Sequence, residues 1–148
     1  TSAGSFTIVN DNDILGELSF FGDDGTDAVS EGARIFARVE GTPGANDLPT
    51  EIVFSTSPDG SNAVTERLRI SNAGHLLPAA DDTYDLGSSS LQFRDVYTGD
   101  LNLNNTKHRV NEVDGTSGSW TIQEGDDNLY ILNRLNGKKY KFNLTEVE

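Results

Sequence analysis

The stretch ARIFARVE, residues 33–40, decides the fold class, because apolar side chains alternate along it with side chains that are mostly charged. In an extended chain the odd-numbered residues from Ala33 to Val39 point to one side, and the even-numbered residues from Arg34 to Glu40 point to the other. The small side chains of Ala33 and Ala37 suggest that another element approaches closely. We therefore predict a β-strand here with one face turned toward apolar surroundings.

The same alternation recurs along the chain, and Gly, Asn, Asp and Ser interrupt it about every 8–12 residues. No segment shows sustained helical periodicity, so the sequence predicts an all-β fold of short antiparallel strands. Within one of these segments, Leu68 and Ile70 are expected to point inward and Arg67 and Arg69 outward. The predicted strands cover residues 6–9, 15–21, 33–40, 52–54, 66–70, 75–77, 101–104, 120–123, 129–132 and 138–144.

The last third of the chain reads as a separate β meander. Residues 129–132 are apolar at successive positions, which is typical of a strand buried on both faces. Asn136-Gly137 is a strong signal for a two-residue hairpin turn, and it leads into the strand 138–144. We expect a sandwich-like β module over residues 1–78, a connector over 79–105 and a C-terminal β-meander tip module over 106–148.

Composition limits the possible classes of protein. Only 34% of the residues are hydrophobic, so a single copy would have a thin core, and burial between copies is one remedy. Disorder is the alternative, but regular alternation disfavours it. The net charge of −13 opposes binding to nucleic acid and to anionic membranes. We expect no membrane insertion, since no apolar run approaches 18 residues.

The chain has no cysteine, which excludes disulfides and thiolate metal sites. It also has no methionine and starts at Thr1, so we expect a fragment or a processed product whose attachment domains lie upstream.

One loop offers oxygen ligands of the kind that calcium prefers. Asp23, Asp24 and Asp27 lie within five residues of each other around Gly25. The loop lacks the twelve-residue pattern of an EF-hand, and the alternative is a solvated acidic turn. Ca²⁺ is the one cofactor that the sequence suggests, and otherwise we expect none.

Aromatic and aliphatic side chains supply the remaining candidate residues. Trp120, Tyr130 and Tyr140 lie in the predicted tip module, where exposed rings are suited to glycan or other receptor contacts, and the alternative is that they form the small core of that module. A second group is predicted to form the core or an interface between three copies: Phe20, Phe36, Phe54, Leu68 and Ile70.

Catalysis is not expected. His75 and His108 are the only histidines, and no G-x-S-x-G elbow occurs. Glycan cleavage would need two carboxylates in a groove, and so acidic a chain provides such pairs by chance. The chain is also too short for a long β-helix.

Several segments resemble parts of bacteriophage fibres. Residues 15–22, 33–35, 52–56 and 66–70 resemble a module common in phage tail fibres and tailspikes, and residues 81–101 resemble the connector that often follows it. Residues 119–147 resemble the distal, C-terminal end of fibre-like virion proteins of marine phages, cyanophages in particular. The resemblance implies a parallel homotrimer. In many relatives a self-cleaving chaperone follows the connector, whereas this chain continues after Leu101 into the short meander.

The resemblance implies a structural and receptor-binding segment of a phage tail fibre, made in the host cytoplasm and placed in the virion. Its expected partners are two further copies, other virion tail proteins, and a host cell-surface glycan or protein. A capsid decoration (cement) protein is the first alternative, and a fragment of a polysaccharide depolymerase tailspike is the second.

Overall fold

The computed structural model describes residues 6–107 and 109–147. These residues form nine strands in two antiparallel sheets and contain no helix, which confirms the predicted all-β class. The described residues therefore contain no helix that could span a membrane. The chain divides into two compact units, Thr1–Leu86 and Gly87–Glu148, and this boundary lies within the stretch expected to be a connector.

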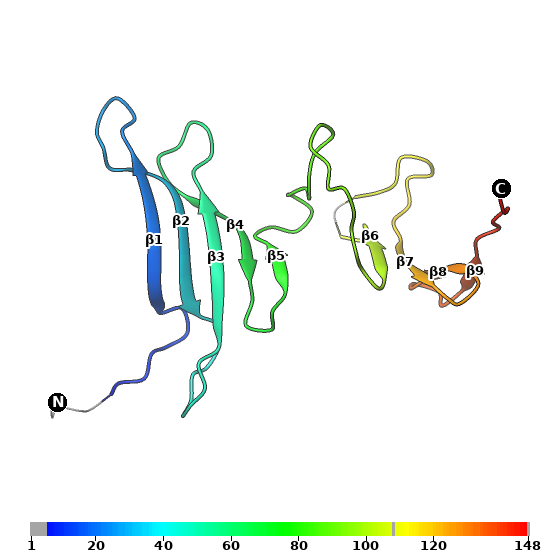
Figure 1. Ribbon diagram of the computed structural model, residues 1–148, viewed down its shortest axis with the longest axis horizontal. Helices are drawn as coiled ribbons and strands as arrows, with labels where there is room; N and C mark the ends of the chain where they lie inside the picture. The colour runs from blue at the N-terminus through cyan, green and yellow to red at the C-terminus, as the bar shows by residue number, and fades with distance from the viewer. Residues whose placement is uncertain (1–5, 108, 148) are drawn as a thin grey trace. The chain divides into compact units, whose positions relative to one another are not determined.

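The first unit holds one sheet of five strands in sequence order (Figure 1). Each strand is antiparallel to the next, as expected for strands joined by short turns. The strands are β1 (Ile14–Gly22), β2 (Ser30–Val39), β3 (Thr50–Thr56), β4 (Thr65–Ile70) and β5 (Leu76–Pro78).

The strand predicted at residues 6–9 is wrong, because these residues have no strand partner. A turn follows them, in which the amide of Asn10 donates to the Asp13 carboxylate at 2.8 Å and Asn12 adopts a φ of 70°. This turn leads directly into β1, which is the edge of the sheet.

The described residues of the first unit form one layer, with no second sheet of the same unit packed against it. The sequence suggested a sandwich-like module because alternation indicates one face that needs covering. Alternation carries no information on whether the covering layer belongs to the same chain. The missing layer is therefore the central structural feature of this unit.

The register separates two chemically different faces. Leu18 pairs with Ile35, and Ile35 pairs with Phe54, so these side chains share one side of the sheet. We call this side the apolar face. Its large side chains are Leu18, Phe20, Ile35, Ile52, Phe54, Leu68, Ile70 and Leu76. The opposite side, which carries the glutamates and arginines of the same strands, is the charged face.

A β-bulge interrupts the register between β3 and β4. Phe54 pairs with Leu68 whereas Ser55 pairs with Glu66, so Arg67 is the extra residue. Arg67 donates hydrogen bonds to the hydroxyls of Thr56 at 3.0 Å and Tyr84 at 3.2 Å. The bulge thereby attaches the segment after β5 to the sheet.

The second unit holds a four-stranded meander in sequence order, and β6 forms one edge, as predicted. Residues 129–132 are not buried on both faces within one chain, since Leu129 is 40% and Tyr130 is 37% exposed. The strands are β6 (Leu101–Asn104), β7 (Ser119–Glu124), β8 (Leu129–Asn133) and β9 (Lys139–Lys141).

The hairpin between β8 and β9 is confirmed, but its two-residue turn is wrong. The loop covers residues 134–138, and only Gly137 adopts a positive φ, of 73°. The side-chain oxygen of Asn133 accepts hydrogen bonds from the amides of Leu135 and Asn136, at 2.9 and 3.1 Å, which favours the wider turn.

Candidate association and receptor-binding surfaces

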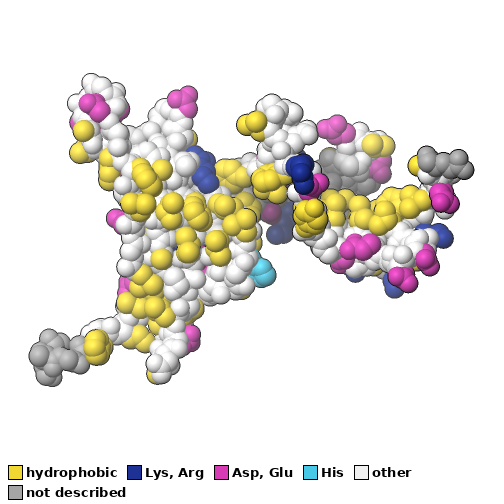
Figure 2. All heavy atoms as spheres, in the orientation of Figure 1, with side chains coloured by type: hydrophobic (Ala, Val, Ile, Leu, Met, Phe, Trp, Pro, Cys, Tyr) yellow, Lys and Arg dark blue, Asp and Glu magenta, His cyan; other side chains and the backbone are white. Residues whose placement is uncertain are grey.

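The apolar face of the first sheet is exposed in the single chain. Leu18 is 57% exposed, Leu76 is 60% and Ile35, on the interior strand β2, is 38%. Figure 2 shows hydrophobic side chains gathered over the strands of this sheet. Contiguous apolar patches of this kind mark interaction sites in water-facing proteins.

The charged face is better covered than the apolar face. Val53 is fully buried there, and Phe36 is 8% exposed. The guanidinium groups of Arg34 and Arg38 lie over the Phe36 ring, at 4.9 and 5.7 Å from its centre. Long side chains therefore shield this face without a second layer, since their aliphatic stems cover apolar surface and their charges remain in water.

Four side chains of the charged face form a closed ring of ion pairs. Glu51 contacts Arg38 and lies 3.5 Å from Arg69, while Glu66 lies 2.6 Å from Arg69 and 3.8 Å from Arg38. Each charge has two opposite neighbours, so the ring is neutral as a whole. The hydrogen bond to Glu66 is the main cause that raises the pKa of Arg69 above its usual value.

The predicted core or interface residues divide between the two faces. Phe36 lies on the charged face beneath the arginines. The other four lie on the apolar face: Phe20, Phe54, Leu68 and Ile70.

The aromatic candidates of the second unit do not form one cluster. Trp120 and Tyr140 lie on one side of the sheet, with their ring centres 5.9 Å apart. Tyr130 pairs with Gln123 and Lys141 on the opposite side, so the structure does not bring it to the other two. Leu101 and Leu103, each 48% exposed, share the side of Trp120.

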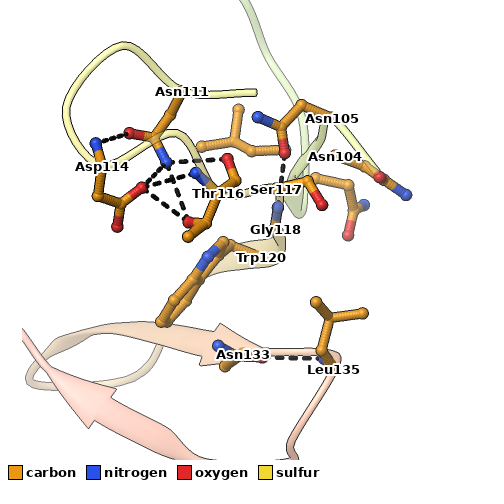
Figure 3. A pocket seen from close by; sticks show the side chains of 12 residues that line it. Asn104, Asn105, Asn111, Asp114, Thr116, Ser117, Gly118, Trp120, Asn133 and Leu135 are labelled. Carbon is orange, nitrogen blue, oxygen red and sulfur yellow. Dashed lines mark hydrogen bonds between the residues drawn. The ribbon is translucent and has the colours of Figure 1, made fainter. Parts of the chain in front are cut away.

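A hollow of about 610 Å³ lies beside Trp120 within the second unit. Figure 3 shows the loop of Asn111, Asp114 and Thr116 on one side of the Trp120 ring and Asn133 on the other. The lining is rich in asparagine, which the sequence analysis missed. The run LNLNN at residues 101–105 was the available signal, but alternation explained it as an edge strand. The asparagines of the lining are Asn102, Asn104, Asn105, Asn111 and Asn133.

The Asp114 carboxylate holds one wall of this hollow. Its Oδ1 accepts hydrogen bonds from the amide and the hydroxyl of Thr116, at 2.9 and 2.8 Å, and from the Asn111 side chain. These donors lower the pKa of Asp114 below its usual 3.8, the backbone amide of Thr116 contributing most.

The aspartates of the acidic loop bind the backbone of their own loop. Asp23 accepts from the Gly25 amide at 2.8 Å, and Asp27 accepts from the Val29 amide at 3.0 Å. Asp24 accepts from the Ser30 hydroxyl at 2.8 Å, which is the main cause that lowers its pKa. In the described part of the chain, no group of three or more acidic, histidine or cysteine side chains is arranged to hold a metal ion. The calcium site stays a prediction.

Comparison with known proteins gives similarity to phage fibre proteins. The side tail fibre protein pb1 of Escherichia phage T5 is 30% identical over 121 residues, which are 72% of this chain and 9% of that protein. The chain is related to bacteriophage tail fibre proteins. The relationship confirms the resemblance to phage tail fibres found in the sequence and places the chain among the proteins of the virion.

Two solved structures share the fold, each with 24% identity. The carboxy-terminal domain of the bacteriophage T5 L-shaped tail fibre matches with a TM-score of 0.51, over 66% of this chain and 41% of the solved chain. The same domain with its intramolecular chaperone domain matches with a TM-score of 0.53, over 76% and 27%. No model of a known protein family matches the chain.

Proposed function

We propose that the chain is a homotrimeric, non-enzymatic segment of a phage tail fibre, which acts with other tail proteins of the virion and contributes contacts to the host surface. The observation that carries this proposal is the apolar face of the first sheet, which one chain leaves in water. Three copies that turn this face toward a common axis would supply the missing layer for one another.

The exposed area supports association. One chain exposes 11884 Å². Two separate compact units that divide 16.0 kDa between them would expose about 9000 Å². The excess of about 3000 Å² is comparable to the area that obligate assemblies bury, about 2000–5000 Å².

The distribution of charge supports the orientation. The charged face is internally neutralised by its ion-pair ring, and its arginines already shield the apolar groups beneath them. It is therefore suited to solvent, while the apolar face is suited to burial. The number of copies follows from the resemblance to fibre modules, in which three parallel chains surround the fibre axis.

Light scattering coupled to size-exclusion chromatography tests the assembly. We expect a mass of about 48 kDa, three times the 16.0 kDa of one chain. The variant Ile35→Lys places a charge on the apolar face and should dissociate the trimer. The matched control is Leu77→Lys, because Leu77 pairs with Arg69 on the charged face. A monomer of the unaltered chain, or equal dissociation by both variants, would contradict the proposal.

Two further measurements address the alternatives. Antibodies against the chain should label virion tails, whereas labelling of the capsid would favour a decoration protein. The chain should release no reducing sugar from host polysaccharide. A supporting observation is that the hollow beside Trp120 has one carboxylate in its lining, Asp114, whereas glycoside hydrolysis uses a pair.

A further inference from the structure

We infer that the hollow beside Trp120 binds a neutral saccharide through asparagine amide groups. This inference rests on the proposed function, because it names the ligand class by which such a fibre segment would contact a host surface. The hydrogen bonds that hold the asparagine side chains, and not their number alone, suit the hollow to this ligand class.

The side-chain oxygens of these asparagines are already engaged. The Oδ1 atom of Asn105 accepts from the Gly118 amide at 2.6 Å. The Oδ1 atom of Asn133 accepts from the amides of Leu135 and Asn136. These bonds fix each carboxamide in one orientation, so its NH₂ group has a fixed direction.

The same arrangement occurs at β6. The Oδ1 atom of Asn104 accepts from the amide of Thr106 at 2.9 Å and from its hydroxyl at 2.8 Å. The Oδ1 atom of Asn102 accepts from the Thr121 hydroxyl at 2.6 Å.

The corresponding NH₂ groups of Asn105 and Asn133 donate to no other residue within 6–107 and 109–147, and both residues belong to the lining of the hollow (Figure 3). Two oriented donors on opposite walls are suited to a ligand with many oxygen acceptors. The free oxygen of the Asp114 carboxylate adds an acceptor for a hydroxyl group.

The remaining lining is apolar. The Trp120 ring, Leu103 and Leu135 offer surface to the C–H face of a sugar ring, and Leu135 is 63% exposed. No Lys, Arg or His belongs to the described lining, and its one charge is negative, which disfavours an anionic sugar. The volume of about 610 Å³ lies within the usual range of small-molecule sites, about 300–1000 Å³.

The test uses the full chain and the emission of Trp120, which is the only tryptophan. Maltose, lactose, α-mannobiose and N,N′-diacetylchitobiose would be titrated separately to about 50 mM, with glucuronic acid as an anionic probe. We expect at least one neutral disaccharide to change the emission saturably, with a Kd of about 1 mM per site, and glucuronic acid to have no effect.

Asparagine-to-aspartate variants separate binding from structure, because they keep the accepting oxygen and replace the NH₂ donor with a charged carboxylate oxygen. Asn105→Asp and Asn133→Asp should each weaken binding of that disaccharide about tenfold or more. The matched control is Asn136→Asp, which adds the same charge in the loop that follows Asn133 but lies outside the lining. Its affinity should be unchanged.

Three results would overturn the inference. The first is an emission unaffected by all four neutral sugars, and the second is equal affinity in all three variants. The third is a change of oligomeric mass in Asn105→Asp or Asn133→Asp without a change in sugar affinity, which would identify the hollow as a contact between copies. A trimer that binds no sugar leaves the proposed assembly intact, whereas a monomer that binds sugar refutes the assembly and not the site.

Discussion

At the scale of single residues, Gly118 is constrained by the indole of Trp120. A Cβ atom at this position would lie 2.8 Å from Nε1 and 3.1 Å from Cδ1 of that ring. The backbone amide of Gly118 is also held by Asn105, so the loop cannot retreat without breaking a hydrogen bond.

We therefore predict that Gly118→Ala destabilises the chain by about 1–3 kcal/mol and shifts the emission of Trp120. Gly99→Ala is the control, because a Cβ at Gly99 meets nothing within 4 Å and its φ is not left-handed. Urea unfolding followed by circular dichroism measures the stability of both variants. Equal stability of the two variants would show that the ring adapts without cost.

The lowered pKa of Asp114 predicts that the stability of the folded chain depends on pH. This pKa is lowered in the folded chain, so the unfolded chain binds more protons as the pH falls. The stabilisation is complete above the usual pKa of 3.8 and is lost as the pH falls through the lower folded value. Thermal melting between pH 5 and pH 2 should therefore show a smaller acid-induced loss for Asp114→Asn than for the unaltered chain.

Asp126→Asn is the control for this pH series, since the Asp126 side chain accepts no hydrogen bond from other residues in the described ranges. It removes a carboxylate from the same unit and should retain the acid sensitivity of the unaltered chain. Equal pH profiles for the two variants would show that the hydrogen bonds of Asp114 do not cause the acid-induced loss of stability.

At the scale of elements, the ion-pair ring joins β2, β3 and β4 on the charged face. Its central member, Glu51, has a side chain that is 3% exposed and contacts two arginines. The Glu17 side chain is 47% exposed and lies 3.5 Å from Arg34, its one ion-pair partner in the described residues. Removal of a buried carboxylate lowers the free energy of unfolding more than removal of an exposed one. The arginines beside the buried carboxylate stay desolvated but lose the charge that compensated them.

We predict that Glu51→Gln destabilises the chain by about 2–4 kcal/mol and Glu17→Gln by less than about 1 kcal/mol. Urea unfolding at fixed protein concentration compares them. A loss at Glu17 as large as that at Glu51 would mean that exposure does not govern the energy of these pairs.

At the scale of the whole molecule, association should determine stability. Because the apolar face has no cover within its own unit, the folded chain is expected to gain stability from each partner that binds it. The melting temperature should therefore rise with protein concentration. Calorimetry over a hundredfold concentration range would show this rise, and a constant melting temperature would contradict it.

Except at residues 6–9, the sequence by itself determined where the strands lie and the chemistry of their faces. The alternation in residues 33–40 and 66–70 is a local property of the sequence. An extended strand places alternate side chains on opposite faces, so this pattern predicts a strand with one apolar face and one solvent face. The relationship to tail fibres was likewise readable from the segments at 15–22, 81–101 and 119–147.

Only the tertiary structure decided what lies across from each strand. It showed that the apolar face has no covering layer in its own unit, that Glu51 belongs to a ring of charges, and that Tyr130 lies on the opposite side of the sheet from Trp120. It also brought Asn105, Asn133 and Trp120 to one hollow. These relations depend on strand register and on loops that bring distant residues together, and side-chain order along one strand does not encode them.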